Sequence, residues 1–436
     1  MLRRFSLYGF LKNQRYFEPF LWLAFLDMGL SFAWIGGLIA FRQVAQNLME
    51  LPTGAIADLW GRRKCMMFSF ASYIVSFAIM GSVGVAAQHD YIGMNALIPL
   101  LFIAMVFYAV GDAFRTGTHK AMIFTWLRKH GRENERTTVY GYTRSWSKIG
   151  SAVSVVLAGV FVFVTRSYVY VFFFSIPPYL LNVINFAGYP SEVDGAVGDK
   201  RSLAEVFHHL KQALRTSVRQ TDIRRLLFES MGFGGFFAAS KDYLQPILKA
   251  AALPLTAALF AGALGHEEQR VVILVVPVYF ALFLVSAFAS RNAHRLVGAR
   301  GNEDRAARFL WGLFALVLAT LTPIMYFGAY WVTQSLMILG FAGLYVIQNL
   351  WRPVLMSRFD IHSQEGAGAT VLSIESQAKS GATALLAPLL GFAVDSAAAH
   401  HVGQTAFWPV TAVGALVASL FFVTTKPGSV RRAGEL

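Results

Sequence analysis

The residues that could do chemistry in this sequence are charged side chains that interrupt long apolar runs. A charge at the centre of a bilayer costs about 2.5–3.5 kcal/mol on insertion scales, so such side chains face a bundle interior, pair with one another or reach the membrane surface. The chemistry that they favour is the binding of solutes and ions in a polar cavity. Ten of these side chains are basic: Lys12, Arg15, Arg42, Arg115, Lys120, Arg144, Lys148, Lys241, Arg352 and Lys379. The acidic ones include Glu18, Glu50, Glu229, Glu375, Asp112 and Asp242.

Helical spacing groups many of these residues on polar faces, because side chains three or four positions apart lie on one side of a helix. The first, second and fourth apolar runs each have such a predicted face. The faces are Lys12, Arg15 and Glu18 in the first run, Arg42, Gln46 and Glu50 in the second, and Asp112, Arg115 and His119 in the fourth.

The fifth run presents two cations one helical turn apart, Arg144 and Lys148. Like charges at this spacing repel each other, so the pair needs an anionic partner, which Asp112, Glu18 or a bound substrate would supply. The first half of the chain carries more cations than acids within its apolar runs. Because a cavity of that sign attracts anions, we expect an anionic or zwitterionic organic substrate.

We therefore expect a substrate and ion cavity, with structural ion pairing between helices as the alternative. Glu375 and Lys379, one turn apart, would in the alternative neutralise each other, and Lys241 with Asp242 would mark a local kink. The candidate cavity residues are Arg15, Glu18, Arg42, Asp112, Arg115, His119, Arg144, Lys148, Lys241, Asp242 and Glu375.

Four of these candidates could also carry protons. Histidine titrates near physiological pH, and burial raises the pKa of a carboxyl toward that range. The candidate proton carriers are Glu18, Asp112, His119 and Glu375, whereas Lys12, Lys120 and Arg352 lie near the ends of their runs and are expected to snorkel.

The composition explains why these charges sit in apolar surroundings. The chain has 436 residues, of which 56% are hydrophobic and 14% are charged, whereas soluble domains carry roughly 25% charged residues. A single cysteine, Cys65, excludes an internal disulfide and a multi-cysteine metal site. Adjacent histidines without further ligands are weak evidence for a metal site. We expect an integral membrane protein with no metal and no cofactor.

Twelve apolar runs are long enough to span a bilayer, which takes about 20 residues. A polar linker at 190–225 separates two halves of the chain, 1–189 and 226–436, each with six apolar runs. The linker holds a predicted amphipathic helix that begins at Ser202. The start of the chain lacks the apolar core of a signal peptide. The predicted spans are 7–26, 32–57, 65–85, 97–126, 138–164, 168–189, 226–248, 271–289, 308–329, 331–356, 368–394 and 405–424.

The distribution of Lys and Arg predicts the orientation of the spans. If the N-terminus is cytoplasmic, the inside segments hold 25 Lys and Arg residues and the outside loops hold three. Cytoplasmic loops carry the excess of basic residues in membrane proteins, so both termini are predicted to be cytoplasmic. The same asymmetry accounts for the net charge of +14 without a nucleic-acid partner.

The loop after the second predicted span reads GAIADLWGRRK, from Gly54 to Lys64. It matches the pattern G-x-x-x-D-x-x-G-(R/K)-(R/K), and it follows a Glu-Leu-Pro-Thr-Gly segment that begins at Glu50. In pattern and position it resembles the signature of the major facilitator superfamily, and the segment from Gly111 to Leu127 resembles the fourth helix of one bacterial subgroup. The resemblance implies an all-α fold of twelve transmembrane helices in two pseudo-symmetric six-helix bundles.

The resemblance also implies a secondary transporter that works by alternating access, as a symporter or antiporter in the plasma or inner membrane. In the family the loop forms a latch between the halves, which would here be Gly54, Asp58, Gly61, Arg62 and Arg63. In the alternative, the basic residues of the loop only determine topology. We expect a monomer that carries a small organic solute, with protons as the coupling ion.

Three other functions compete with this prediction. The fifth predicted span lacks the Gly-Pro motif of many antiporters of the family, which argues against multidrug or cation efflux. A sensor or a lipid flippase on the same scaffold stays open, since a fold does not determine a function. A membrane enzyme is disfavoured, because no nucleotide loop, nucleophile motif or metal-ligand cluster stands in the sequence. The identity of the substrate and the direction of transport have no sequence signal.

Overall fold

The computed structural model describes residues 1–194, 219–260, 265–328, 331–362 and 368–425, and every regular element in these ranges is a helix. The predicted amphipathic helix of the linker falls on residues 195–218, outside the described part. Contacts divide the chain into two compact units. The first comprises Met1–Gly29, Phe41–Phe207 and Ala263–Phe280, and the second comprises Leu30–Ala40, His208–Gly262 and Ala281–Leu436.

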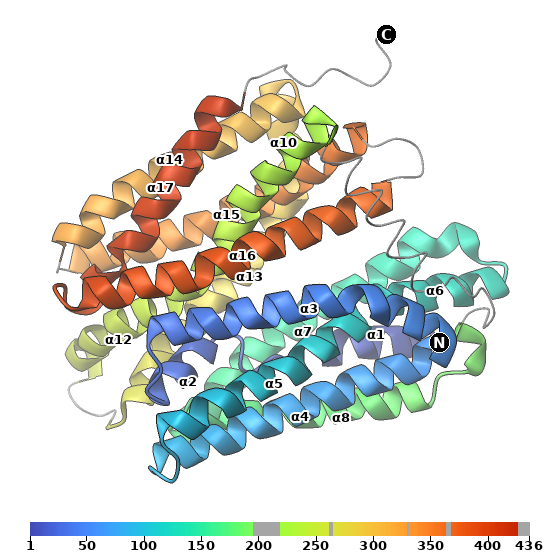
Figure 1. The fold of residues 1–436 in the computed structure, drawn as a ribbon, viewed down its shortest axis with the longest axis horizontal. Helices are drawn as coiled ribbons and strands as arrows, with labels where there is room; N and C mark the ends of the chain where they lie inside the picture. The colour runs from blue at the N-terminus through green and yellow to red at the C-terminus, as the bar shows by residue number, and fades with distance from the viewer. Residues whose placement is uncertain (195–218, 261–264, 329–330, 363–367, 426–436) are drawn as a thin grey trace. The chain divides into compact units, whose positions relative to one another are not determined.

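The first unit is built mainly from helices of the N-terminal half (Figure 1). Helix α4 packs against α5 and α8, and α1 packs against α7. The helices and short turns in chain order are α1 (Leu2–Leu11), α2 (Leu21–Asp27), the larger part of α3 (Phe32–Trp60), α4 (Arg62–Gln88), α5 (Met94–Arg115), α6 (Thr118–Lys129), η1 (Glu133–Glu135), α7 (Arg136–Thr165), α8 (Tyr170–Ala187) and η2 (Ser191–Asp194).

Aromatic rings fill the centre of the first unit between α4, α5 and α8. The ring of Tyr73 lies 5.1 Å from that of Tyr108 and 5.2 Å from that of Tyr179, in edge-to-face arrangements. Gly111 lets α4 and α5 approach closely, since a Cβ atom there would lie 2.9 Å from the Tyr73 ring. Edge-to-face ring pairs add about 0.5–1.5 kcal/mol beyond the area they bury.

The second unit holds the described helices of the C-terminal half, together with the first residues of α3. Helix α14 packs against α15 and α17, and α16 packs against η3 and α11 (Figure 1). Its elements are α10 (Thr221–Ser230), the π-helical turn η3 (Met231–Gly235), α11 (Phe236–Ser240), η4 (Lys241–Tyr243), α12 (Leu244–Phe260), α13 (Glu267–Arg300, which begins in the first unit), α14 (Glu303–Phe327), α15 (Trp331–His362), α16 (Gly368–Ala398), η5 (Gly403–Phe407) and α17 (Trp408–Thr424).

Stacked rings also form the centre of the second unit. Phe233, in the π-helical turn, stacks on Trp351 with the ring centroids 4.5 Å apart and the ring planes 6° from parallel. Trp311 lies edge-on to both of them. The first helical segment of this half is therefore irregular where it meets the core, and such π-turns frequently occur at functional sites.

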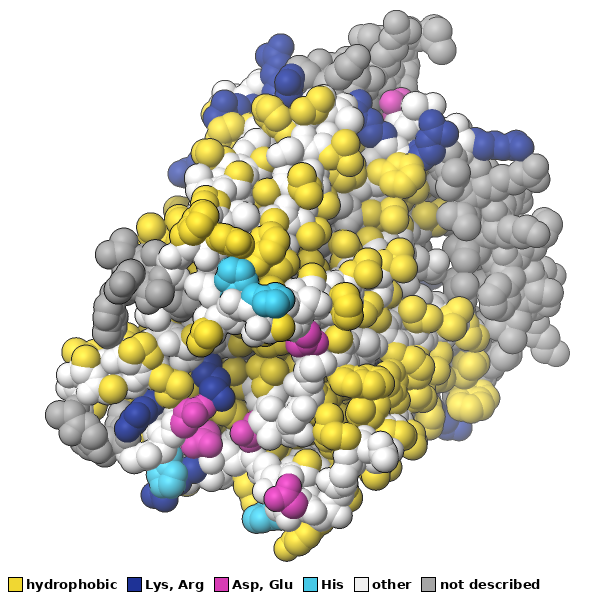
Figure 2. Space-filling view, turned by 60° about the vertical axis from the view of Figure 1, so that its left-hand side comes forward, with side chains coloured by type: hydrophobic (Ala, Val, Ile, Leu, Met, Phe, Trp, Pro, Cys, Tyr) yellow, Lys and Arg dark blue, Asp and Glu magenta, His cyan; other side chains and the backbone are white. Residues whose placement is uncertain are grey.

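The surface of the described residues carries many large apolar side chains (Figure 2). Phe288 and Phe392 are each 67% exposed and Leu416 is 73% exposed. Extended apolar surface is rare on soluble monomers and typical of a surface that faces lipid. Nine helices or helical runs of the described part are long and apolar enough to cross a membrane. The predicted all-α membrane fold is confirmed, whereas the count of twelve spans stays a prediction.

Candidate functional site

A cavity of about 440 Å³ lies in the first unit, between the C-terminal end of α1, the junction of α5 with α6, and one face of α7. The chain breaks at two of these places, because α1 ends at Leu11 and α5 ends at Arg115. Gly117, at φ +79°, makes the turn into α6 in a conformation that favours glycine. We name this cavity the basic pocket, because five cations line it: Lys12, Arg115, Lys120, Arg144 and Lys148.

One cation of the basic pocket, Arg115, forms an ion pair with a carboxylate. Its Nη2 atom donates to Oδ1 of Asp112 at 2.7 Å, and its Nε atom donates to the hydroxyl of Tyr73 at 3.0 Å. The Tyr73 hydroxyl in turn donates to Asp112. The charge of Arg115 is therefore balanced, and its guanidinium is held against α4 and α5.

The other four cations of the basic pocket are Lys12, Lys120, Arg144 and Lys148. In the described part of the chain, no ion pair joins any of them to a carboxylate. Aromatic rings contact three of them: Lys12 lies 5.4 Å from the ring of Tyr8, and Lys120 and Arg144 lie 5.7 and 5.8 Å from the ring of Tyr140. Such contacts are worth about 0.5–1 kcal/mol at exposed sites and leave the charge uncompensated.

Five uncharged polar side chains of the basic pocket already donate to the backbone. Each hydrogen bond runs to the carbonyl oxygen four residues earlier, over 2.8–3.3 Å. Because Lys and Arg carry donors and no acceptors, the donors that remain for a ligand come mainly from the cations. The side chains bound in this way are Asn13, Thr116, Thr143, Ser147 and Ser151.

His119 adds a buried polar atom to the wall of the basic pocket. Its side chain is 6% exposed and stacks on Tyr8 with the ring centroids 3.7 Å apart. The Nε2 atom is buried and has no hydrogen-bond partner in the described part of the chain. A buried polar atom without a partner costs about 1–3 kcal/mol.

Two of the predicted polar faces are wrong, because the backbone breaks within them. Residues 12–20 form no helix, so Lys12, Arg15 and Glu18 do not share a helical face. Several polar residues interrupt the apolar run here. Pro19 also disfavours a helical conformation at Glu18. His119 lies on α6 instead of continuing the helix of Arg115. The breaks also bring Lys12 and Lys120, expected to snorkel, into the lining of the basic pocket.

Three other candidates of the first unit do not line the basic pocket: Arg15, Glu18 and Arg42. The guanidinium of Arg42 lies 5.1 Å from the ring of Tyr108. Arg15 and Arg42 each have a buried Nε atom without a hydrogen-bond partner in the described part.

The remaining candidates belong to the second unit, where they form ion pairs. Glu375 is fully buried, accepts two hydrogen bonds from Arg352 and accepts another from the hydroxyl of Ser230. Lys241 pairs with its neighbour Asp242 at 2.6 Å in the turn η4. Arg352, expected to snorkel, therefore neutralises a buried acid.

The signature loop lies within the first unit, at the start of α4. Gly61 adopts φ +91°, and the backbone N–H of Arg63 donates to Asp194 at 2.6 Å. The Arg63 side chain donates to the carbonyl of Tyr189, and that of Arg62 donates to Thr125. Asp194 thus caps the N-terminus of α4, where a carboxylate is favoured by the helix dipole. The side chain of Asp58 and the surroundings of Gly54 lie outside the described structure.

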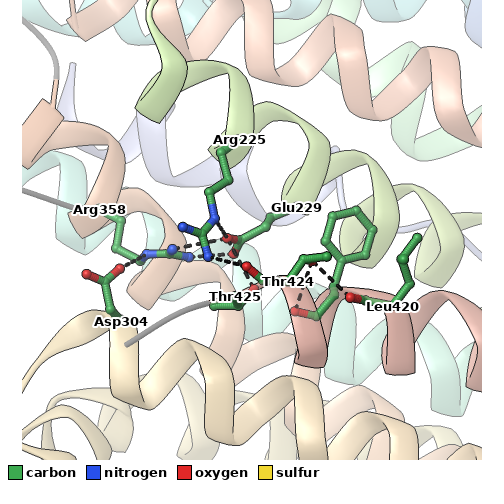
Figure 3. A network of polar contacts seen from close by, with 8 residues as sticks. Arg225, Glu229, Asp304, Arg358, Leu420, Thr424 and Thr425 are labelled. Carbon is green, nitrogen blue, oxygen red and sulfur yellow. Dashed lines mark hydrogen bonds and ion pairs between the residues drawn. The ribbon is translucent and has the colours of Figure 1, made fainter. Parts of the chain in front are cut away.

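A buried charge network in the second unit joins the second half of α10 to α14, α15 and the end of α17 (Figure 3). Arg358 is 2% exposed and forms two hydrogen bonds to Glu229, at 2.6 and 3.1 Å, and one to Asp304 at 2.8 Å. Arg225 lies 3.4 Å from Glu229 and donates to the carbonyl of Thr424. Arg358 has no local sequence pattern that identifies this role, since its partners are 54 and 129 residues away.

The start of α3 is fixed by α16 within the second unit. The two carboxylate oxygens of Asp395 accept from the backbone N–H groups of Phe32 at 3.0 Å and Ala33 at 2.8 Å. The helices cross in close contact, because a Cβ atom on Gly36 would lie 2.3 Å from the carbonyl oxygen of Ala387. Asp395 therefore supplies a remote cap to α3.

Comparisons with known proteins identify the family. The family model described as the Major Facilitator Superfamily matches residues 13–378. A search of curated protein sequences gives no match.

Solved structures of transporters are similar in fold at low sequence identity. The nucleoside transporter NupG is 11% identical with a TM-score of 0.69, over 97% of this chain and 96% of that chain. A bacterial homologue of the iron transporter ferroportin, in an inward-facing state, is 12% identical with a TM-score of 0.70, over 98% of each. The xylose transporter XylE from E. coli is 13% identical with a TM-score of 0.60, over 98% and 97%.

Proposed function

The chain belongs to the major facilitator superfamily and is an integral membrane protein of a transporter family, and from this premise we propose that it carries a small organic anion. The anion would bind in the basic pocket of the first unit. The observation that supports this proposal is the set of four cations there, Lys12, Lys120, Arg144 and Lys148, which no described carboxylate pairs.

Electrostatics favours an anion in this pocket over the other solute classes. Two unit charges 4 Å apart interact by about 4 kcal/mol at an effective dielectric constant of 20, so four neighbouring cations strongly disfavour a cationic solute. The acids that a cation would need, Asp112, Asp242 and Glu375, are each paired with an Arg or a Lys. The multidrug and cation efflux alternative therefore has the weaker support.

The triad of Asp112, Arg115 and Tyr73 suggests how a proton would be coupled to the anion. Arg115 lines the basic pocket, and Asp112 holds its guanidinium. Protonation of Asp112 would weaken that ion pair and leave Arg115 available to the anion. The proton and the anion would then bind together, which is the requirement for symport.

We further propose the organisation that the sequence predicts: six-helix bundles at 1–189 and 226–436, both termini in the cytoplasm, and a monomer in the plasma or inner membrane. Alternating access would then proceed by rocking of one bundle against the other around a central site. The loop of Gly54, Asp58, Gly61, Arg62 and Arg63 would act as the cytoplasmic latch.

The test is uptake into proteoliposomes that contain the purified protein. Labelled organic anions, lipophilic cations and neutral solutes are compared with and without a pH gradient. We expect saturable uptake of anions only, increased when the outside is acidic. Uptake of cations driven by the opposite pH gradient would overturn the proposal and support efflux by antiport.

A further inference from the structure

We infer that the basic pocket selects organic solutes with two or more negative charges carried on separate oxyanion groups, and discriminates against monoanions. This inference rests on the proposed function and goes one step further, to the substrate class. It is supported by the number of cations in the pocket, by their origin on three segments of the chain, and by the small number of uncharged donors that remain for a ligand.

The charge balance of the pocket requires more than one negative charge. A monoanion would neutralise one of the four cations that lack a described carboxylate partner, and would leave three. Two of these four, Arg144 and Lys148, stand one turn apart on α7, where like charges repel. A dianion or trianion brings the site closer to neutrality, and each added charge acts on cations that already share one lining.

The positions of the cations require separated oxyanion groups. Lys12 follows the end of α1, Lys120 lies on α6, and Arg144 and Lys148 lie on α7. The cations of the lining therefore come from three separate segments of the chain. A single carboxylate is matched by one guanidinium fork, so a second oxyanion group is needed to engage the cations that the first leaves without a partner.

The donors that remain in the pocket favour an oxyanion over a neutral polyol of the same size. A polyol hydroxyl is a neutral acceptor, whereas an oxyanion accepts charge-assisted hydrogen bonds, which are roughly twice as strong. In the basic pocket, Thr116, Thr143, Ser147 and Ser151 have used their hydroxyl hydrogens on the backbone. Lys and Arg present donors only. The lining is therefore complementary to a ligand rich in acceptor oxygens.

Carboxylates and phosphate esters share this chemistry, and one experiment separates them. Isothermal titration of the purified protein at pH 7.5 and constant ionic strength compares succinate with monomethyl succinate, which has the same carbon chain and one charge fewer. A second arm compares 3-phosphoglycerate, which has a phosphate and a carboxylate, with glycerol 3-phosphate, which has the phosphate alone. We expect succinate, 3-phosphoglycerate or both to bind at least about tenfold more tightly than the partner with one oxyanion group fewer, which corresponds to about 1.4 kcal/mol.

Variants locate the discrimination in the pocket. Lys148→Gln should reduce the preference for the dianion to about threefold or less, and Lys148→Arg, which keeps the charge, should retain it. Arg128→Gln, which removes an exposed cation of α6 outside the pocket lining, should bind as the wild type does. Melting temperatures of all variants control for folding.

Two results would overturn the inference, and only the second would also reject the proposed function. Equal affinity of succinate and its monoester in the wild type would reject the charge selection and leave an anion transporter standing. Binding of no anion, in a protein that melts cooperatively and takes up another class of solute, would reject the proposed function as well.

Discussion

The carboxylate of Asp395 accepts a hydrogen bond from the backbone N–H of Phe32 at 3.0 Å, across 363 positions of sequence. Phe32 is the first residue of α3, and the next N–H, that of Ala33, binds the second carboxylate oxygen. The first N–H groups of a helix have no partner within the helix. Asp395 satisfies two of them and places a negative charge at the positive end of the helix dipole.

Replacement of Asp395 by Leu should release the start of α3. Loss of a capping carboxylate costs about 0.5–2 kcal/mol, which shifts an equilibrium between held and released states by roughly 2- to 30-fold. The change is measured by labelling of Ser31→Cys with a water-soluble maleimide, for which the buried Cys65 gives little background. We expect faster labelling in the Asp395→Leu protein, and an unchanged rate would show that the contact does not hold α3.

Two adjacent glycines on α3 offer a matched test of the helix crossing. A Cβ atom on Gly36 would lie 2.3 Å from the carbonyl oxygen of Ala387, whereas a Cβ atom on Gly37 would meet nothing within 4 Å. Gly36→Ala should lower the melting temperature, because two backbones must separate. Gly37→Ala should leave it unchanged or raise it, since Ala is favoured over Gly in a helix by about 1 kcal/mol. Equal melting temperatures would contradict the crossing.

Two ion pairs of the same type test the importance of the buried network. Arg358 and Glu229 are 2% and 0% exposed, whereas Arg132 and Glu135 are 37% and 44% exposed. Arg358→Met leaves Glu229 with the more distant Arg225, removes the pair with Asp304 and should cost about 3–5 kcal/mol, while Arg132→Met should cost far less, because solvent screens that pair. Denaturant unfolding in detergent measures both values, and similar costs would show that the burial of the network has no energetic effect.

A second substitution separates the charge from the packing of the network. Adding Glu229→Gln to Arg358→Met removes the buried negative charge that Arg358 neutralises. The double variant should therefore be more stable than the sum of the two single changes predicts, as a double-mutant cycle would measure. Additive costs would indicate that Arg358 stabilises the unit through contacts other than its charge.

The local part of the candidate site could be predicted from the sequence. The i,i+4 spacing of Arg144 and Lys148 on a continuous helix placed both on one face, and both line the basic pocket. Asp112 and Arg115, three residues apart on one predicted face, form an ion pair, although the sequence offered Asp112 as a partner for Arg144 and Lys148. In each case the residues share one helix, so helical periodicity alone relates them.

The remaining features depend on breaks and on distant partners, for which periodicity carries no signal. Lys12 and Lys120 reach the pocket because the chain turns at residues 12–20 and at Gly117. Asp194 and Asp395 cap helices to which they have no sequence proximity. A hydropathy profile shows the helices of such a chain, but the contacts between remote polar groups form only when the helices assemble.

The most direct test of the account is the uptake of an anionic substrate by two charge-matched double variants in proteoliposomes. Arg144→Gln with Lys148→Gln removes two cations from the basic pocket, and Arg128→Gln with Lys129→Gln removes two exposed cations outside its lining. The account predicts that the first variant loses at least about tenfold in initial rate at low substrate concentration, because two charge-assisted contacts are lost, while the second transports as the wild type does. Equal rates in the two variants, with both proteins folded, would contradict the assignment of the basic pocket as the anion site.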